Sequence, residues 1–234
     1  MIPILDDNPT RRRPLVNWAF IAACIAVYVL QINLSAQRHN ALLDAYGFIP
    51  VTIFGSSGDA GFALVPDWSW TTLVTSMFLH GGLLHLGGNL LYLWIFGNNV
   101  EEAMGHARYF LFYLSVGVLA AATEGVVNSS STVPMVGASG AISGVLAAYV
   151  LVFPRARVTV VVPLGVLLYP MKISALFVVL FWFAIQVLQG LAADPETQSV
   201  AFWAHIGGFV TGAALTPFFS RFPLYGRRRI GPWN

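Results

Sequence analysis

The chain has 234 residues, of which 57% are hydrophobic and only 9% are charged, with a formal net charge of +2 at pH 7. Soluble globular domains carry about a quarter charged residues, so lipid rather than water must cover most of this surface. At about 20 apolar residues per membrane span, the length allows one domain of about five to seven helices and excludes a separate soluble catalytic domain. The small positive balance does not indicate nucleic acid, and the single cysteine, Cys24, excludes a disulfide framework.

Six apolar stretches follow one another along the chain, and each predicts a helix that crosses the membrane. The first follows the polar residues 1–13, is longer than a signal-peptide core and lacks a small-residue cleavage site, so we interpret it as an uncleaved span. A long loop, roughly residues 35–72, separates the first two spans. The expected spans are residues 15–34, 83–100, 109–127, 137–153, 173–193 and 201–220.

The basic residues predict how these spans are oriented. If the N-terminus is cytoplasmic, eleven of the twelve Lys and Arg residues fall on the cytoplasmic side, and only Arg38 falls outside. This asymmetry favours an even number of spans with both ends in the cytoplasm. We therefore expect an all-α membrane protein: a six-transmembrane-helix bundle that forms one domain over residues 1–234, with a cytoplasmic N-terminal segment (1–13) and a cytoplasmic tail (221–234). Short loops and the uncleaved first span favour a bacterial cytoplasmic membrane.

Polar side chains collect at one depth of this predicted bundle. His85 and Asn89 begin the second span, Ser139 begins the fourth, and His205 lies one turn into the sixth. All three spans enter from outside, so these residues share the outer third of the membrane. Because polar residues are costly in lipid, this shared depth indicates a functional site.

Each of these residues also has a purely structural interpretation. Ser139 could be a helix N-cap, and His205 could be an ordinary hydrogen-bonded residue near the interface. Together they fit catalysis better, because a serine nucleophile needs a base within hydrogen-bond reach. Glycines would let the two helices approach closely enough: Gly140 and Gly144 on one, Gly208 and Gly212 on the other.

His85 and Asn89 are four residues apart and therefore share one helix face. They could form an oxyanion hole together with the backbone N–H of Ser139, or they could be a buried polar pair bonded to the preceding loop. A zinc site from His80, His85 and His205 is weakly supported, because no H-E-x-x-H motif or suitably spaced carboxylate is present. Glu124, an acid inside the third span, is interpreted as interfacial rather than catalytic.

Several motifs resemble those of the rhomboid family. Residues 78–89 (FLHGGLLHLGGN) resemble its second-span motif with an H-x-x-x-N core, and residues 137–141 (GASGA) resemble its G-x-S-G motif. Residues 204–212 (AHIGGFVTG) resemble its A-H-x-x-G-x-x-x-G motif, while Glu101 and Gly105 match its E-x-x-x-G turn. The motifs occur in the family's order and on the expected spans.

The resemblance implies a six-helix intramembrane serine protease. Ser139 would be the nucleophile, His205 the general base, and His85 and Asn89 the oxyanion donors. The substrates would be membrane proteins, cut in or near their transmembrane segments. The protease itself would be surrounded by the lipid bilayer. No cofactor or metal is implied, and the oligomeric state is not indicated. Some members carry an aromatic residue four positions after the serine, stacked on the histidine; here it is Ser143, so a hydrogen bond or another aromatic must orient His205.

Two other functions are weighed against proteolysis. A non-catalytic membrane scaffold with the same fold would be expected to lose Ser139 or His205, and both are present. A small-solute transporter is disfavoured, because the sequence shows no repeat and no pair of Gly/Pro-broken helices in corresponding halves.

Overall fold

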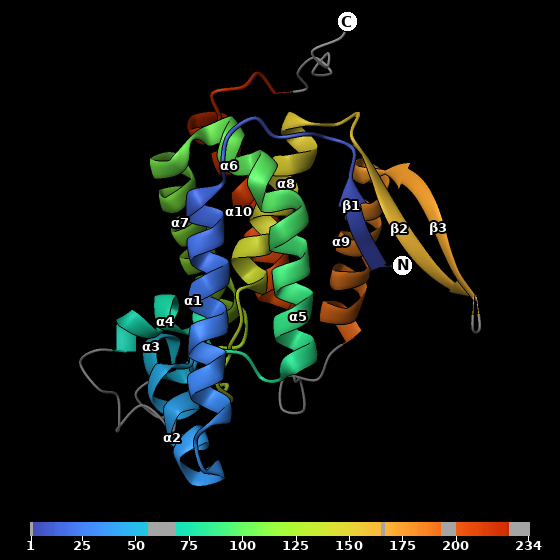
Figure 1. The fold of residues 1–234 in the computed structure, drawn as a ribbon. Helices are drawn as coiled ribbons and strands as arrows, with labels where there is room; N and C mark the ends of the chain where they lie inside the picture. Colours follow the sequence, from blue (N-terminus) through green and yellow to red (C-terminus); the bar gives the residue numbers. More distant parts are fainter. Residues whose placement is uncertain (1, 56–68, 165–166, 193–199, 225–234) are drawn as a thin grey trace, which may run out of the picture.

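The computed structural model describes residues 2–55, 69–164, 167–192 and 200–224. Each expected span coincides with a helical segment (Figure 1). The second is composite: α5 is followed by a π-helical segment, Leu93–Gly97, and then by α6. The helices are α1 (Leu15–Ile32), α5 (Leu83–Tyr92), α6 (Asn98–Met104), α7 (His106–Val127), α8 (Ser139–Val152), α9 (Ala175–Ala192) and α10 (Phe202–Phe219).

Three of these helices are long and apolar enough, by themselves, to cross a membrane. Within the described residues these are α1, α7 and α9. The helix α8 is apolar but has only 14 residues. The protein is therefore a helical membrane protein, while the count of six spans stays a prediction.

Helix α8 is the central helix of the bundle. Every residue from Gly140 to Val150 is buried, because α7 and α10 pack against it along its length. A helix so enclosed does not face lipid, which is why it can carry polar residues such as Ser143 and Tyr149. The predicted glycine contact is confirmed: a side chain on Gly144 would lie 2.9 Å from the carbonyl oxygen of Gly208 on α10.

The expected loop over residues 35–72 contains short helices. These are α2 (Ala36–Tyr46), α3 (Val51–Phe54), a 3-10 turn at Ser69–Thr71 and α4 (Thr72–Thr75). Backbone hydrogen bonds in both directions join Phe48 to Met135, so this region is attached to the segment that precedes Ser139.

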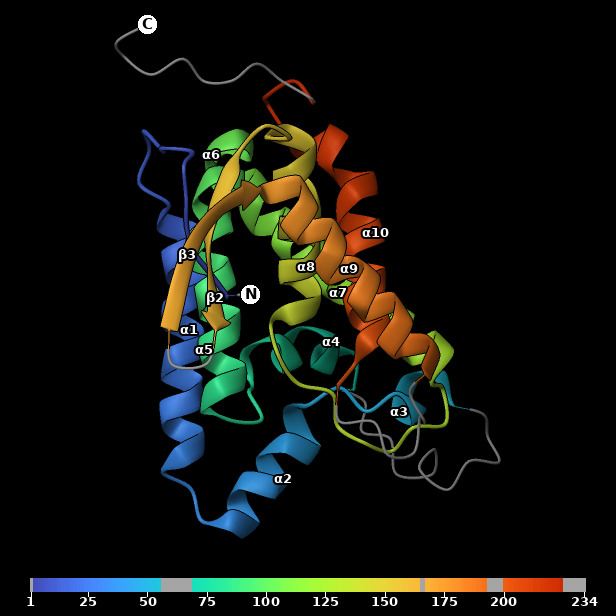
Figure 2. The ribbon, with the colours of Figure 1, turned by 90° about the vertical axis from the view of Figure 1, so that its right-hand side faces the viewer.

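The expectation of an all-α fold is wrong in one respect, because the chain also forms a three-stranded antiparallel sheet. Its strands are β1 (Ile2–Asp6), β2 (Arg157–Leu164) and β3 (Leu167–Ser174), in the order β1-β2-β3. Val160 pairs with Pro3 on one side and with Met171 on the other. The sheet stands beside α5 and α9 (Figures 1 and 2).

The β-branched run 158–162 (VTVVV) favours strand, and Pro163 and Pro170 disfavour helix. The N-terminal segment is thus folded onto the bundle.

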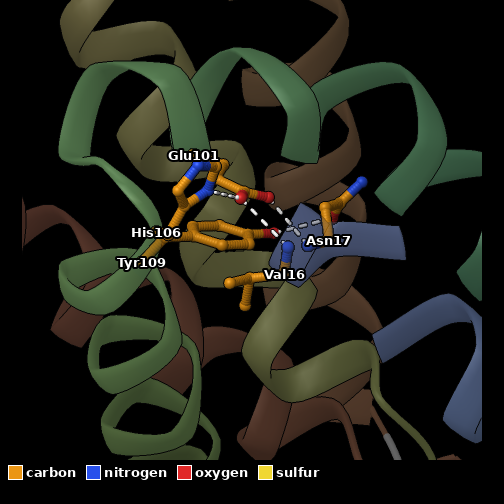
Figure 3. A network of polar contacts seen from close by, with 5 residues as sticks. All are labelled: Val16, Asn17, Glu101, His106 and Tyr109. Atoms are coloured by element: carbon orange, nitrogen blue, oxygen red, sulfur yellow. Dashed lines mark hydrogen bonds and ion pairs between the residues drawn. The ribbon is translucent and has the colours of Figure 1, made fainter. Parts of the chain in front are cut away.

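A polar network fixes the start of α1 (Figure 3). The carboxylate of Glu101 on α6 accepts hydrogen bonds from the backbone N–H groups of Val16 (3.0 Å) and Asn17 (2.7 Å). Tyr109 donates to the side chain of Asn17, and His106 contacts Glu101. The first N–H groups of a helix lack intrahelical partners, and the residue before α1, Pro14, offers no side-chain cap. Glu101 therefore caps α1 from a neighbouring helix.

Candidate active site

A cavity of about 810 Å³ lies where α5, α7, α8, α9 and α10 meet. All four residues singled out from the sequence, His85, Asn89, Ser139 and His205, line it. Its other lining residues are largely apolar or small. The common depth expected from the sequence thus corresponds to one common cavity.

Ser139 and His205 are in direct contact in this cavity. The Oγ atom of Ser139 lies 2.7 Å from Nε2 of His205, within the range of a good hydrogen bond. Ser139 is the first residue of α8, and the N-cap position before it is occupied by Ala138. The glycine contact between α8 and α10 brings the two backbones close enough for these short side chains to meet. An imidazole so placed can take the hydroxyl proton of a serine nucleophile.

The other nitrogen of His205 contacts a residue that sequence reasoning missed. Nδ1 lies 2.6 Å from Oε1 of Gln186 on α9. The ring of Trp182, one turn earlier on α9, lies 5.8 Å from the imidazole, centroid to centroid. Ser143 instead donates its hydroxyl proton to the backbone oxygen of Ser139, 2.6 Å away. A hydrogen bond and an aromatic from α9 therefore hold the histidine. In the sequence the available signal was weak, because Gln186 is one of two glutamines in an apolar stretch.

His85 and Asn89 approach the nucleophile from α5. A side chain on Gly137 would lie 2.7 Å from Nε2 of His85 and 3.6 Å from Nδ2 of Asn89, so both nitrogens lie against this glycine, two residues before Ser139. Gly137 has a φ of 124°, a conformation that other residues rarely adopt. Glycine is thus required at this position both for its backbone and for the space it leaves.

The hydrogen-bond partners of these two side chains differ. Nδ1 of His85 accepts a hydrogen bond from the N–H of Gly81 (3.4 Å), so Nε2 carries the proton and can donate. Nδ2 of Asn89 is buried and has no partner among the described residues. If His85 and Asn89 were only a structural pair, both would be expected to bond to the loop before α5. In the described part of the chain His85 makes such a bond and the Nδ2 atom of Asn89 does not. Two N–H donors face the space beside Ser139.

His80 lies before α5 and is fully buried. Gln31 on α1 holds its backbone, accepting from its N–H and donating to its carbonyl oxygen, both at 3.0 Å. Burial and the nearby His85 lower the pKa of His80 to about 4, so its ring is neutral at pH 7. Within the described residues, no cluster of three or more His, Cys, Asp or Glu side chains could hold a metal.

Glu124, interpreted as interfacial from the sequence, is buried beside the cavity. Its carboxylate accepts a hydrogen bond from the amide of Asn128 and another from the backbone N–H of Ala204, 3.0 Å away. Ala204 belongs to the first turn of α10, whose N–H groups lack intrahelical partners. Glu124 therefore caps the helix that carries His205.

The fold and the cavity define a helical membrane protein whose site is built on a serine–histidine pair. The Rhomboid domain family matches residues 67–222, which span α4 to α10 and include all four site residues. The chain belongs to the rhomboid family.

Named relatives of this chain occur in bacteria, plants and fungi. It is 29% identical to Rhomboid protease GluP of Bacillus subtilis over 87% of this chain and 35% of that protein. It is 33% identical to Rhomboid-like protein 11, chloroplastic, of Arabidopsis thaliana (66% of this chain, 54% of that protein), and 32% identical to Rhomboid-type serine protease 2 of Emericella nidulans (71% and 30%). The chain thus spans between 30% and 54% of these relatives' lengths.

Proposed function

We propose that this chain is an intramembrane serine protease that hydrolyses peptide bonds in or near the transmembrane segments of membrane proteins. The observation that carries the proposal is the 2.7 Å hydrogen bond between Ser139 Oγ and His205 Nε2, inside a cavity of a membrane protein. Two relatives named as proteases, from Bacillus subtilis and Emericella nidulans, support it.

In the proposed reaction, Ser139 Oγ attacks the carbonyl carbon of the substrate peptide while its proton passes to Nε2 of His205. The negative charge that develops on the carbonyl oxygen is stabilised by N–H groups of His85 and Asn89 and by the backbone N–H of Ser139. Collapse of the tetrahedral intermediate breaks the C–N bond, and His205 returns the proton to the leaving amine. Water then hydrolyses the ester on Ser139, with His205 again acting as the base.

The proposal includes a topology of six spans with both ends in the cytoplasm. Its support is the charge asymmetry, since the turn between α6 and α7 and the start of β2 lie at the same end of the bundle as the start of α1 (Figure 1). Arg108 lies in the first turn of α7, Arg155 lies just before β2, and Arg157 is its first residue. A bacterial cytoplasmic membrane remains the expected location, although relatives include a chloroplastic protein.

Labelling with a serine-directed fluorophosphonate tests the proposal without a known substrate. Purified protein in detergent should be labelled on Ser139, as located by mass spectrometry, and the label should be lost in Ser139→Ala and in His205→Ala. Ser143→Ala is the matched control, because Ser143 is a buried serine one turn along the same helix. It should be labelled normally.

The same variants should be compared in cleavage of a model transmembrane substrate. Loss of cleavage in Ser139→Ala, with an unchanged thermal unfolding temperature, would support the proposal. Cleavage that persists in Ser139→Ala would refute Ser139 as the nucleophile. A folded wild-type protein that neither cleaves nor reacts would refute the proposed protease and favour a non-catalytic scaffold.

A further inference from the structure

We propose that Gln186 is a positioning residue that fixes the tautomer and the orientation of His205. The site is then a hydrogen-bonded row of three side chains, Ser139, His205 and Gln186. The inference rests on the proposed function. It adds a residue from α9, a helix that carries none of the four residues expected from the sequence.

The contact between Gln186 and His205 is a short hydrogen bond made by a buried glutamine. Oε1 of Gln186 is 2.6 Å from Nδ1 of His205, and the glutamine side chain is 7% exposed. The two residues lie on different helices, α9 and α10, which pack side by side (Figure 2). A buried polar group on an apolar helix costs stability unless a partner compensates it, and here the partner is the imidazole.

The chemistry of the three groups sets the direction of each hydrogen bond. An amide oxygen can only accept, so Nδ1 of His205 carries the ring proton and donates it to Gln186. In a neutral imidazole this leaves the lone pair on Nε2, the atom that lies 2.7 Å from the hydroxyl of Ser139. The opposite tautomer would present an N–H to Ser139 and could not accept its proton. Gln186 thus selects the tautomer that a general base requires.

A neutral amide suits this position better than a carboxylate. When His205 takes the proton of Ser139 it becomes an imidazolium, and the bond from Nδ1–H to Oε1 becomes charge-assisted and stronger. A carboxylate would stabilise that cation more, but it would also bury a charge in the interior of a membrane protein before the reaction begins. Gln186 gives part of the stabilisation without that cost.

The other groups around His205 do not replace this role. His85 lines the same cavity from α5, and its Nδ1 already accepts the N–H of Gly81. The carboxylate of Glu124 binds the N–H of Ala204, and no hydrogen bond joins it to the imidazole among the described residues. The ring of Trp182 is tilted by 41° relative to the imidazole, and tryptophan offers no acceptor to Nδ1.

The first experiment measures kcat and KM for a model transmembrane substrate, and the rate of fluorophosphonate labelling. Gln186→Leu removes the acceptor and should lower kcat and the labelling rate about 10- to 100-fold with little change in KM, the range for losing one hydrogen bond to a group that becomes charged. Gln186→Glu keeps an acceptor oxygen at the same reach and should restore most of the rate. The matched control is Gln189→Leu, an exposed glutamine on the same helix, which should behave as wild type.

The second experiment reads the tautomer directly. The chain has five histidines, so the ¹⁵N NMR signals of the His205 ring can be assigned by difference from His205→Ala. In Ser139→Ala, where catalysis plays no part, Nδ1 should be protonated and Nε2 unprotonated. Adding Gln186→Leu, or Gln186→Met should the leucine variant fail to fold, should move the proton towards Nε2.

The two experiments separate this inference from the proposed function. An unreactive wild-type protein with a Gln186-dependent tautomer would refute the protease and keep the contact. A reactive wild-type protein in which Gln186→Leu changes neither kcat nor the tautomer would overturn the positioning role. A folded Gln186→Leu variant that loses rate while the tautomer of His205 stays unchanged would also overturn it.

Discussion

The glycine contact between α8 and α10 predicts that one added methyl group far from the substrate reduces catalysis. In Gly144→Ala, the new Cβ would lie 2.9 Å from the carbonyl oxygen of Gly208 and 3.2 Å from Cα of Gly212, and it would meet the side chain of Val116 still more closely. Relief of the first overlap, to an ordinary carbon–oxygen contact of about 3.4 Å, requires the helices to separate by about 0.5 Å. Overpacking of this kind costs about 1–3 kcal/mol of stability.

This displacement has a direct consequence for the proposed dyad. Gly208 lies one turn beyond His205 on α10, so a shift of the helix carries the imidazole with it. The 2.7 Å hydrogen bond to Ser139 would lengthen to about 3.2 Å, at the outer limit for a good bond. Since a misplacement of about 1 Å can cost about 100-fold, we expect kcat to fall about 10-fold or more in Gly144→Ala.

The assay is cleavage of a transmembrane substrate, read together with fluorophosphonate labelling and thermal unfolding in detergent. Gly87→Ala on α5 is the control, because a side chain there would have no atom within 4 Å. Gly208→Ala should be the more severe variant, since its Cβ would overlap the carbonyl oxygen of Gly140 itself. Wild-type cleavage by Gly144→Ala at unchanged stability would refute the claim that this contact sets the distance from Ser139 to His205.

Two further predictions concern Asn89 and Asp6. Asn89→Ala should lower kcat by up to about 10²–10³-fold while leaving the unfolding temperature nearly unchanged, because its Nδ2 donor has no partner to lose in the described structure; an unchanged kcat would contradict the oxyanion role. Burial raises the pKa of Asp6 on β1 from 3.8 to about 6, although the hydroxyl of Tyr149 donates to its carboxylate. The raised pKa means that the folded state, with β1 in place, binds the proton of Asp6 more tightly than the unfolded state does. The contribution of this proton to the free energy of unfolding is therefore complete below pH 4 and is lost as the pH rises through about 6. Unfolding temperatures measured from pH 4 to 8 should therefore fall more steeply for wild type than for Asp6→Asn, and parallel curves would contradict this.

The sequence alone indicated four candidate residues that the structure brings to one cavity, because local patterns carry that information. The limits of an apolar stretch mark the limits of a predicted helix. The membrane depth expected for His85, Asn89, Ser139 and His205 follows from where each stretch begins. The close approach of α8 and α10 also follows from glycines at regular spacing. This much could be predicted because each helix, and the place of each candidate residue along it, depends on residues that are neighbours in the sequence.

Gln186 and the sheet could not be predicted in the same way. Gln186 has the same appearance in the sequence as Gln31, a polar residue in an apolar span, yet Gln31 holds the backbone of His80 and Gln186 contacts the site. The sheet pairs β1 with β2 across about 150 residues, a contact that no local pattern encodes. Its Val-rich strand is also as apolar as a helix that faces lipid. In both cases the missing information is which distant element lies opposite.

The position of His205 depends on three neighbouring helices, and each acts on a different part of it. Glycines of α8 set how closely its backbone approaches Ser139, Glu124 of α7 holds the first turn of α10, and Gln186 of α9 holds the ring nitrogen that faces away from the nucleophile. A hydrogen bond of 2.7 Å between two short side chains tolerates errors of only a few tenths of an ångström. Three restraints from three helices achieve this, and among the described residues the hydrogen bonds of the imidazole go to Ser139 and Gln186 and not to a carboxylate. Ser139 and His205 can therefore meet at hydrogen-bond distance although they belong to different helices.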